Sequence, residues 1–384
     1  MANIKNYIRS WRDLRRFRNL PAAERRMVFY SEGRTYGGFL APVMDSLAKN
    51  HGQRPCYITS DAADPFLDSG NERFQCFYIG PGAALITAFQ TMKATVLVMT
   101  APDLDRFHIK RSVHPVHYVY LYHSMVSSHM IYREGAFDHY DTILCAGPHH
   151  VAEIRAWERL QGLPEKQLLE HGYGPLDALM AQAARRTPRT PLPQDKLRIL
   201  LAPSWGIGGL LETGAGTLVK QLLGAGHQVW VRPHPRTRQL SPKVLDALRA
   251  QFIGIEGFHY DEDTSDFDAL FNADVMISDW SGVALEFAFG LGKPVLFIDG
   301  PRKINNPRYQ EIGVEPLEVT CRDTIGAILD PSELGRAPEM VESLWRDREA
   351  IDERARRLRT ETVFNVANSG DSGAAIIARL AAET

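Results

Sequence analysis

The sequence predicts an α/β protein made of two Rossmann-like lobes with parallel sheets, an interlobe cleft and a helical C-terminal tail. Its 384 residues exceed the length at which a single hydrophobic core usually keeps growing. Apolar runs of strand length alternate with helical stretches, which is typical of a parallel sheet covered by helices on both faces. A segment rich in Pro, Arg and Thr at 184–196 interrupts this alternation once, and is predicted to be a linker.

Residues 1–26 are predicted to form a basic amphipathic helix. Interfacial aromatic side chains suit a membrane surface, and an anionic leaflet attracts each nearby cation by about 1 kcal/mol. We therefore expect an anionic membrane surface as a partner; the alternative is a solvated helix or one that packs on a domain. The basic residues are Lys5, Arg9, Arg12, Arg15, Arg16, Arg18, Arg25 and Arg26, and the apolar ones are Tyr7, Ile8, Trp11, Leu14 and Phe17.

The first Rossmann-like lobe is predicted over 27–183. Its opening run, MVFYSEG, reads as a buried strand that ends in a glycine turn, and a helical stretch follows it. Ser31 and Gly33 lie on this turn, so we expect them at the rim of the cleft. Further strand-like runs are RPCYITS, RFQCFYIG, ATVLVMT, HYVYLYH and TILCAG.

The second lobe is predicted over 197–340, with strands in LRILLAPSWG, QVWVRPHP, ADVMISDWSG and KPVLFID. Ligands of such sheets bind at the carboxyl ends of the strands, so the turns after the strands are the places to search. Residues 341–384 read as charged helices that we expect to pack back on the first lobe.

The strongest chemical signal is the strand, turn and helix within 273–299. The strand stops at Ser278 and Asp279, and a helix is predicted to begin near Ser281 and Gly282, with Glu286 in its first turns. Small residues at a helix start leave backbone N–H groups open to an anion. The alternative is that Asp279 or Ser281 only caps the helix. We favour nucleotide-phosphate binding.

The turn RPHP follows the strand QVWV and carries two potential phosphate donors. Arg232 offers a planar fork of N–H groups, and His234 can donate to a phosphate when it is protonated. Arg232 could instead cap a helix C-terminus. A glycine-bearing turn, APSWGIGG, places Ser204 and Trp205 at the same predicted rim, as a weaker signal.

His123 follows the strand HYVYLY in the first lobe, with Ser124 next to it. An imidazole with a pKa of about 6.5 suits a general base for a hydroxyl group at neutral pH. Eight of the 13 histidines lie within 108–150, however, so the choice of one among them is open. A zinc site built from His114, His117, His123 or His129 lacks the usual spacing and partners, and we expect no metal.

The composition is typical of a globular protein and gives no sign of a nucleic-acid-binding or membrane-spanning one. Hydrophobic residues at 44% and charged residues at 23% are ordinary for a globular protein, and the net charge of −2 gives no reason to expect nucleic acid as a partner. The four dispersed cysteines read as thiols in a reducing compartment. No apolar run is long enough to span a bilayer, and no signal peptide is evident. We expect a cytoplasmic protein that is peripheral on the inner face of the cell membrane.

Taken in order over 27–330, these segments resemble the CDP-glycerol glycerophosphotransferase family, the teichoic-acid primases and polymerases with a GT-B fold. The resemblance lies in VFYSEG, the strand ending in His123, GYGPLD, APSWG, RPHP and SDWSGVALEFAFGLGKPVLF. HSMVSS replaces the family's glycine-threonine-proline turn, and GYGPLD lacks the usual arginine. The chain therefore looks like a divergent member.

The resemblance implies a transferase that moves a polyol phosphate, glycerol phosphate first, from a CDP-activated donor to a hydroxyl of a cell-surface glycan or lipid-linked acceptor. His123 would deprotonate the acceptor, with Ser31, Gly33 and Ser124 on the acceptor side, and CMP would leave. His234 would act beside Arg232 at the pyrophosphate, with no cofactor required. The alternatives are a glycosyltransferase using a CMP- or UDP-linked sugar, a sugar 2-epimerase, and a non-catalytic nucleotide-binding scaffold.

Overall fold

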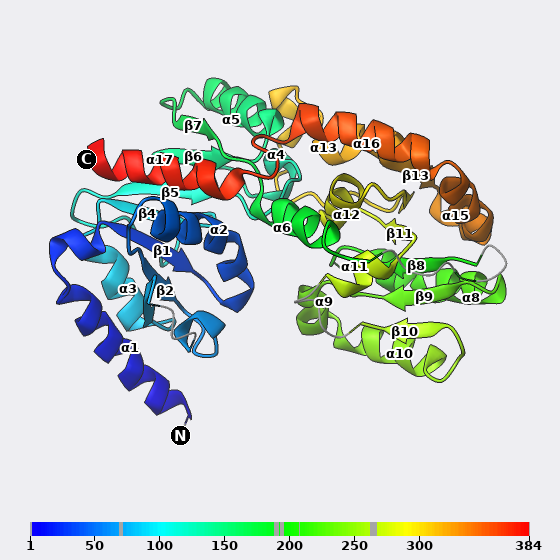
Figure 1. Cartoon of the computed structure of the whole chain (residues 1–384), viewed down its shortest axis with the longest axis horizontal. Helices are drawn as coiled ribbons and strands as arrows, with labels where there is room; N and C mark the ends of the chain where they lie inside the picture. The colour runs from blue at the N-terminus through cyan, green and yellow to red at the C-terminus, as the bar shows by residue number, and fades with distance from the viewer. Residues whose placement is uncertain are drawn as a thin grey trace. The chain divides into compact units, whose positions relative to one another are not determined.

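A computed structural model describes residues 2–68, 72–187, 192, 196–206, 208–261 and 267–383. The chain divides into two compact α/β units (Figure 1). Unit 1 comprises 1–175, 306–314 and 363–384, and unit 2 comprises 176–305 and 315–362. Because the chain returns to unit 1 twice, neither unit is one continuous stretch of sequence.

Unit 1 is built on a parallel sheet with the strand order β3-β2-β1-β4-β5-β6-β7 among the described residues. The order reverses between β1 and β4, which makes their carboxyl ends a topological switch point. The strands are β1 (Met27–Ser31), β2 (Cys56–Thr59), β3 (Gln75–Tyr78), β4 (Val96–Met99), β5 (His117–Leu121), β6 (Thr142–Cys145) and β7 (Gln167–Glu170).

Helices cover both faces of this sheet, so the central strands are apolar on both sides. On one face, Ile377 and Leu380 of the last helix pack with Val43 of the second helix, as Figure 1 shows for α17 and α2. The helices of unit 1 are α1 (Ala2–Arg18), η1 (Ala22–Arg25), α2 (Arg34–Asn50), η2 (Pro65–Leu67), α3 (Ala83–Gln90), α4 (Ser128–Ile131), α5 (Pro148–Gln161), η3 (Tyr309–Ile312) and α17 (Ser369–Glu383).

Unit 2 repeats the design with a parallel sheet of order β10-β9-β8-β11-β12-β13 among the described residues. Its strands are β8 (Arg198–Leu201), β9 (Gln228–Val231), β10 (Phe258–Tyr260), β11 (Val275–Ser278), β12 (Val295–Ile298) and β13 (Gly326–Leu329). Its helices are α6 (Gly174–Ala183), α7 (Leu210–Thr213), α8 (Ala215–Gly224), α9 (Pro235–Leu240), α10 (Pro242–Phe252), α11 (Asp268–Asn272), α12 (Val283–Leu291), α13 (Leu317–Thr320), α14 (Arg322–Ile325), η4 (Pro331–Arg336), α15 (Ala337–Arg346) and α16 (Arg348–Thr362).

The predicted domain limits differ from the observed units at three places. Most of α6 belongs to unit 2, because Leu176 and Leu179 pack against Gly290 of α12. Helix α16 also stays with unit 2, where Ile351 joins the core, so only 363–384 of the predicted tail return to unit 1. The crossing segment 306–314 was not predicted. Most of the predicted linker 184–196 lies outside the described residues.

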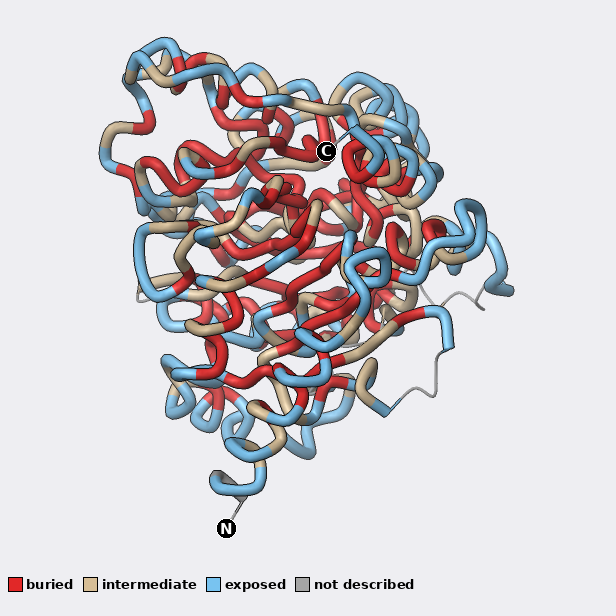
Figure 2. The backbone as a smooth tube through the Cα atoms, turned by 90° about the vertical axis from the view of Figure 1, so that its left-hand side faces the viewer, coloured by how far each residue is buried: buried red, intermediate tan, exposed pale blue. Residues whose placement is uncertain are grey.

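Helix α1 is not a free amphipathic helix along its whole length. Leu14 and Phe17 are buried, and the Phe17 ring meets Phe77 edge-on at 5.6 Å between centroids. The carboxylate of buried Asp13 accepts a hydrogen bond from the backbone N–H of Tyr78. The N-terminal turns remain exposed, as Figure 2 shows near the N-terminus. None of the described helices combines the length and apolarity needed to cross a membrane.

Candidate functional site

The predicted residues of unit 2 gather at the carboxyl ends of β8, β9 and β11. These strands are neighbours in the sheet, so the turns that follow them share one edge. Asp279 accepts a hydrogen bond of 2.7 Å from the backbone N–H of Ser204, and the Ser278 hydroxyl donates to the carbonyl oxygen of Ala202 at 2.8 Å. The structure therefore joins two turns that lie 75 residues apart in the sequence.

Ser278 and Asp279 are both buried, which limits what they can do for a ligand. Burial raises the pKa of Asp279, and the hydrogen bonds from Ser204 act in the opposite direction. Both side chains stabilise the turns from inside. A ligand would meet the backbone and the side chains around them.

Helix α12 begins at this edge without a side-chain cap. Gly282 is the N-cap residue, and it has no side chain that could accept a hydrogen bond from the first turn. The alternative that Asp279 or Ser281 serves only to cap this helix is therefore not what the structure shows. Ser281, Gly282 and Glu286 are half-buried, and the positive end of the helix dipole remains available to an anion.

Two cations that were not among the predicted site residues lie against the ring of Trp205. The Lys303 Nζ lies 3.1 Å from the centre of the Trp205 ring, and the Arg236 Cζ lies 3.9 Å from it. The His234 ring is 6.2 Å away, centroid to centroid. Arg236 directly follows the RPHP turn, so the sequence could have suggested it as a further phosphate donor. Lys303 lies in an ordinary polar turn after β12 and gave none.

The electrostatics of this group change the role predicted for His234. Burial, followed by the charges of Lys303 and Arg236, lowers its pKa to about 4. Its Nδ1 accepts a hydrogen bond of 3.1 Å from the backbone N–H of Arg236. The imidazole is then neutral at pH 7 with its proton on Nε2, so His234 offers one N–H donor without the positive charge that we had expected.

Arg232 is held differently from the prediction. Its side chain is buried, and its Nη1 forms an ion pair of 3.0 Å with Asp261, at the end of β10. The guanidinium thus has a protein carboxylate as a partner and presents little surface to a ligand. The expectation that Arg232 and His234 form one open pair of phosphate donors needs correction: the cations beside His234 are Arg236 and Lys303.

In unit 1, His123 lies directly after β5 among aromatic side chains. Its Nδ1 is 3.4 Å from the Tyr120 hydroxyl and its Nε2 is 3.3 Å from the Tyr132 hydroxyl. The rings of Tyr36 and Phe39, both on α2, meet it edge-on at 5.5 and 5.8 Å. The imidazole is half-buried, so it is neither free in solvent nor sealed in the core.

This environment lowers the pKa of His123 to about 4, because burial disfavours the charged imidazolium. The value lies well below the 6.5 assumed from the sequence. His123 is therefore neutral at physiological pH, in the form that can accept a proton. Burial raises the pKa of Tyr132, so its hydroxyl stays protonated beside the imidazole.

The three residues predicted on the acceptor side shape turns. Ser31 is fully buried, and its hydroxyl donates to the carbonyl oxygen of Gly33 at 2.7 Å. The predicted rim position is therefore wrong for Ser31, which the end of β1 encloses. Gly33 is the N-cap residue of α2, and the Ser124 hydroxyl accepts a hydrogen bond of 3.3 Å from the backbone N–H of Val126.

Two carboxylates at the β1–β4 switch point were missed. Glu32 follows β1, and Asp103 lies in the loop after β4 with a left-handed backbone (φ 63°). Desolvation raises the pKa of Asp103. It also raises that of Glu32, with a smaller rise from Asp103, although the Glu32 side chain keeps contact with solvent. The left-handed aspartate could have been found only from the structure.

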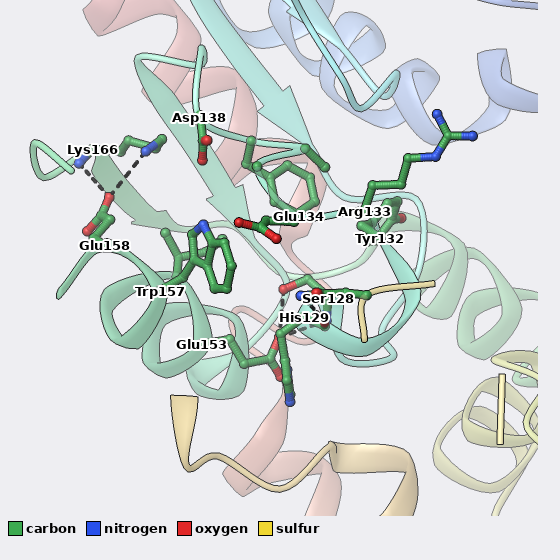
Figure 3. Close-up of a pocket in the computed structure, with 15 residues that line it drawn as sticks. Ser128, His129, Tyr132, Arg133, Glu134, Asp138, Glu153, Trp157, Glu158 and Lys166 are labelled. Atoms are coloured by element: carbon green, nitrogen blue, oxygen red, sulfur yellow. Dashed lines mark hydrogen bonds and ion pairs between the residues drawn. The ribbon is translucent and has the colours of Figure 1, made fainter. Parts of the chain in front are cut away.

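A small pocket of about 30 Å³ lies between α4, α5 and the crossing segment (Figure 3). The Nε2–H of His129 donates to the carbonyl oxygen of Val314 at 3.0 Å, and its Nδ1 is 3.3 Å from Glu153. Burial opposes ionisation of Glu153, but the hydrogen bond with His129 and nearby imidazoles lower its pKa overall. Hydrogen bonds of His129 beside this pocket, with Val314 and Asn306, hold residues 306–314 on unit 1. Among the described residues, no three metal-ligating side chains form a cluster.

The family model for CDP-Glycerol:Poly(glycerophosphate) glycerophosphotransferase matches residues 21–300 of the chain. No curated protein matches it in sequence. Among solved structures, the wall teichoic acid polymerase TagF, soaked with CDPG, is 14% identical with a TM-score of 0.59, and the match covers 100% of this chain and 96% of that one.

Two epimerases share the fold at a similarly low sequence identity. A putative UDP-N-acetylglucosamine 2-epimerase from Listeria monocytogenes is 14% identical with a TM-score of 0.61, covering 94% of this chain and 96% of that one. UDP-GlcNAc 2-epimerase from Neisseria meningitidis, bound to UDP-GlcNAc, is 15% identical with a TM-score of 0.55, covering 93% and 100%. These similarities establish a fold of the GT-B type. With the family match across most of its length, the chain belongs to the CDP-glycerol:poly(glycerophosphate) glycerophosphotransferase family of transferases.

Proposed function

We propose that the protein transfers a polyol phosphate, glycerol phosphate in the first instance, from a CDP-activated donor to a hydroxyl group and releases CMP. The observation that carries the proposal is the cationic group on Trp205, beside the uncapped start of α12. Lys303 and Arg236 supply positive charge, His234 supplies a neutral N–H donor, and the helix start supplies backbone N–H groups. These are the groups that a diphosphate needs.

The proposed reaction is an in-line displacement at the phosphorus of the polyol phosphate. The acceptor oxygen forms a bond to this phosphorus while the bond to the bridging oxygen of CMP breaks. The hydroxyl proton passes to His123, and the negative charge that develops on the leaving CMP is stabilised by the unit 2 cations. Positioning and charge stabilisation then provide most of the catalysis.

A base with a pKa of about 4 is compatible with this reaction. Phosphoryl transfer commonly has a loose transition state, in which the bond to the nucleophile is little formed and its proton is still held. As the new bond to phosphorus forms, the hydroxyl becomes acidic enough to give its proton to a neutral imidazole. The hydroxyls of Tyr120 and Tyr132 lie 3.4 and 3.3 Å from the two ring nitrogens and hold the imidazole plane, and the acceptor hydroxyl would replace one of them at the nitrogen that receives the proton.

We also propose an acceptor for the reaction and a place in the cell where it occurs. The acceptor is a hydroxyl of a cell-surface glycan or of a lipid-linked precursor, and the protein works in the cytoplasm at the inner face of the membrane. The exposed tip of α1, with Ile4, Tyr7 and Ile8 beside basic residues, supports contact with an anionic leaflet.

The direct test is to incubate the protein with CDP-glycerol, a CMP-linked sugar and a UDP-linked sugar, each with and without a lipid-linked acceptor. Acceptor-dependent CMP release from CDP-glycerol is the expected result. Nucleotide release from a linked sugar alone would favour a glycosyltransferase, the second candidate, which the replacement of the family's turn by HSMVSS keeps open. Binding of nucleotide without turnover of any donor would favour a scaffold.

A further inference from the structure

Lys303 and Arg236 place two positive charges on one indole ring of unit 2. The Lys303 Nζ is 3.1 Å and the Arg236 Cζ is 3.9 Å from the centre of the Trp205 ring. Within the described part of the chain, neither cation has a carboxylate within the 4.0 Å that defines an ion pair. Among the described residues the two cations therefore lie close together without an ion-pair partner.

Such an arrangement is unfavourable in the absence of a ligand. The electron-rich face of Trp205 attracts each cation, but the two cations repel one another. Burial, followed by the charge of Arg236, lowers the pKa of Lys303 to about 7. The carboxylate of Asp279 acts in the other direction, but it is already bonded to the backbone N–H of Ser204. A bound anion would remove the repulsion.

We propose that Lys303 is a contact for the diphosphate of the donor, bridged by that diphosphate to Arg236, with Trp205 holding both cations in position. This inference deepens the proposed function and rests on it for the identity of the donor. Two cations and the Nε2–H of His234 provide separate donors for a ligand with two phosphate groups. A nucleoside monophosphate would engage fewer of them, so CMP would bind more weakly and leave after transfer.

The proposal predicts that binding of a diphosphate is linked to uptake of a proton. The charged and titratable groups that face Lys303 are Arg236, His234, which is neutral above about pH 4, and buried Asp279. An anion next to Lys303 raises its pKa from about 7. Binding is therefore strongest below pH 7 and weakens as pH rises towards the pKa of the bound state.

The test is isothermal titration calorimetry of the full chain with CDP and with CMP between pH 6 and pH 9. For the wild-type protein we expect CDP affinity to fall by about tenfold per unit of pH above 7 over the range in which bound Lys303 keeps its proton. Lys303→Arg should retain affinity but lose this pH dependence. Lys303→Met should lose at least about tenfold in CDP affinity at pH 6 and respond little to pH, with a smaller effect on CMP.

Lys220→Met is the matched control, because Lys220 is an exposed lysine of the same unit on α8. It should bind CDP as the wild-type protein does, and thermal unfolding of each variant checks that it is folded. If folded Lys303→Met binds CDP with wild-type affinity and pH dependence, Lys303 does not contact the diphosphate.

Inorganic pyrophosphate and UDP separate this inference from the proposed function. Lys303-dependent binding of both, without preference for CDP, would leave the diphosphate contact in place and reject the cytidine donor. If neither these ligands nor CDP binds the wild-type protein at millimolar concentration, the Lys303 proposal is rejected as well.

Discussion

The roles proposed for His123 and Lys303 need opposite protonation states: a neutral imidazole and a charged ammonium group. His123 must be neutral to accept a proton, and its pKa of about 4 leaves it neutral over the whole physiological range. In the proposed role Lys303 must be protonated to neutralise a phosphate, and its pKa of about 7 limits this to the lower part of that range. If the proposed roles are right, the two residues together confine activity to the pH range between these two values.

We therefore predict that kcat/KM is bell-shaped, with an acid limb near pH 4 and an alkaline limb near pH 7. The profile of kcat/KM reports the free enzyme, so these limbs correspond to His123 and Lys303 without ligand. Initial rates of CMP release between pH 3.5 and pH 9 measure it. An acid limb near 6.5 would mean that His123 does not lie in the environment described.

His123→Ala should lower kcat by about 10²–10⁴-fold, the usual contribution of a general base. Donor affinity should stay near its wild-type value, because in our assignment His123 faces the acceptor oxygen. Titration calorimetry with CDP checks the affinity. His139→Ala serves as the control, since His139 belongs to the same histidine-rich stretch and lies outside the proposed site. A collapse of donor affinity in His123→Ala would reject the assignment.

Buried Glu153 makes the stability of unit 1 depend on pH. Its lowered pKa means that it stabilises the folded state above its unfolded value near 4.5 and that this contribution disappears as pH falls. Glu153→Gln should lower the free energy of unfolding by about 1–3 kcal/mol at pH 7 and flatten its decline towards pH 4. Thermal unfolding across pH measures both. Exposed Glu165→Gln should change neither.

At the scale of elements, the packing of α6 on α12 explains why α6 belongs to unit 2. Gly290 leaves room for the side chains of Leu176 and Leu179; an added Cβ would come within 2.6 Å of Leu179. The close approach depends on the absence of a side chain at this one position.

Gly290→Ala should therefore destabilise the protein by about 1–3 kcal/mol, as overpacking of a well-packed interface commonly does. Gly224→Ala is the matched control, because an added Cβ there meets nothing within 4 Å and the backbone is not left-handed. It should be neutral or slightly stabilising. Chemical denaturation of both variants gives the comparison; equal stabilities would mean that α6 is not packed as described.

The elements also show which features a sequence can predict. The alternation of strands and helices predicted the parallel sheets, and the position of the turns after strands predicted that Ser204 and Asp279 lie at the same rim. Periodicity could not assign α16 and α17 to different units, because both are helices with an apolar stripe and only tertiary packing distinguishes them. The pair of cations was missed for a related reason. Lys303 is marked as a site residue only by its contact with Trp205, about a hundred residues earlier in the sequence.

At the scale of the whole molecule, the chain passes between the units at 175/176, 305/306, 314/315 and 362/363. The crossing segment is anchored on unit 1 by Asn306, whose side chain donates to the carbonyl oxygen of His129 at 3.0 Å. Lys303 lies three residues before this anchor. The segment thus connects, through the chain, a cation of the proposed donor site to the helix that follows His123.

The structure also changes how membrane contact must be tested. Deleting the N-terminal twenty residues would remove Leu14 and Phe17 from the unit 1 core, so the resulting protein would lose stability whether or not it binds membranes. Substitutions at the exposed tip avoid this. Ile4, Tyr7 and Ile8 are each at least 60% exposed, so charged replacements there leave the core intact.

We expect Ile8→Asp to weaken binding to vesicles that contain phosphatidylglycerol, because it puts a carboxylate into an anionic interface in place of an apolar contact. Wild-type binding should fall as salt rises, since the cations of α1 contribute through screened attraction. Val113→Asp, an exposed apolar position on a loop of unit 1, is the control and should bind as the wild-type protein does. Co-sedimentation with vesicles measures all three. Equal binding by the two variants would show that α1 does not contact the membrane, and its basic residues would then serve unit 1 alone.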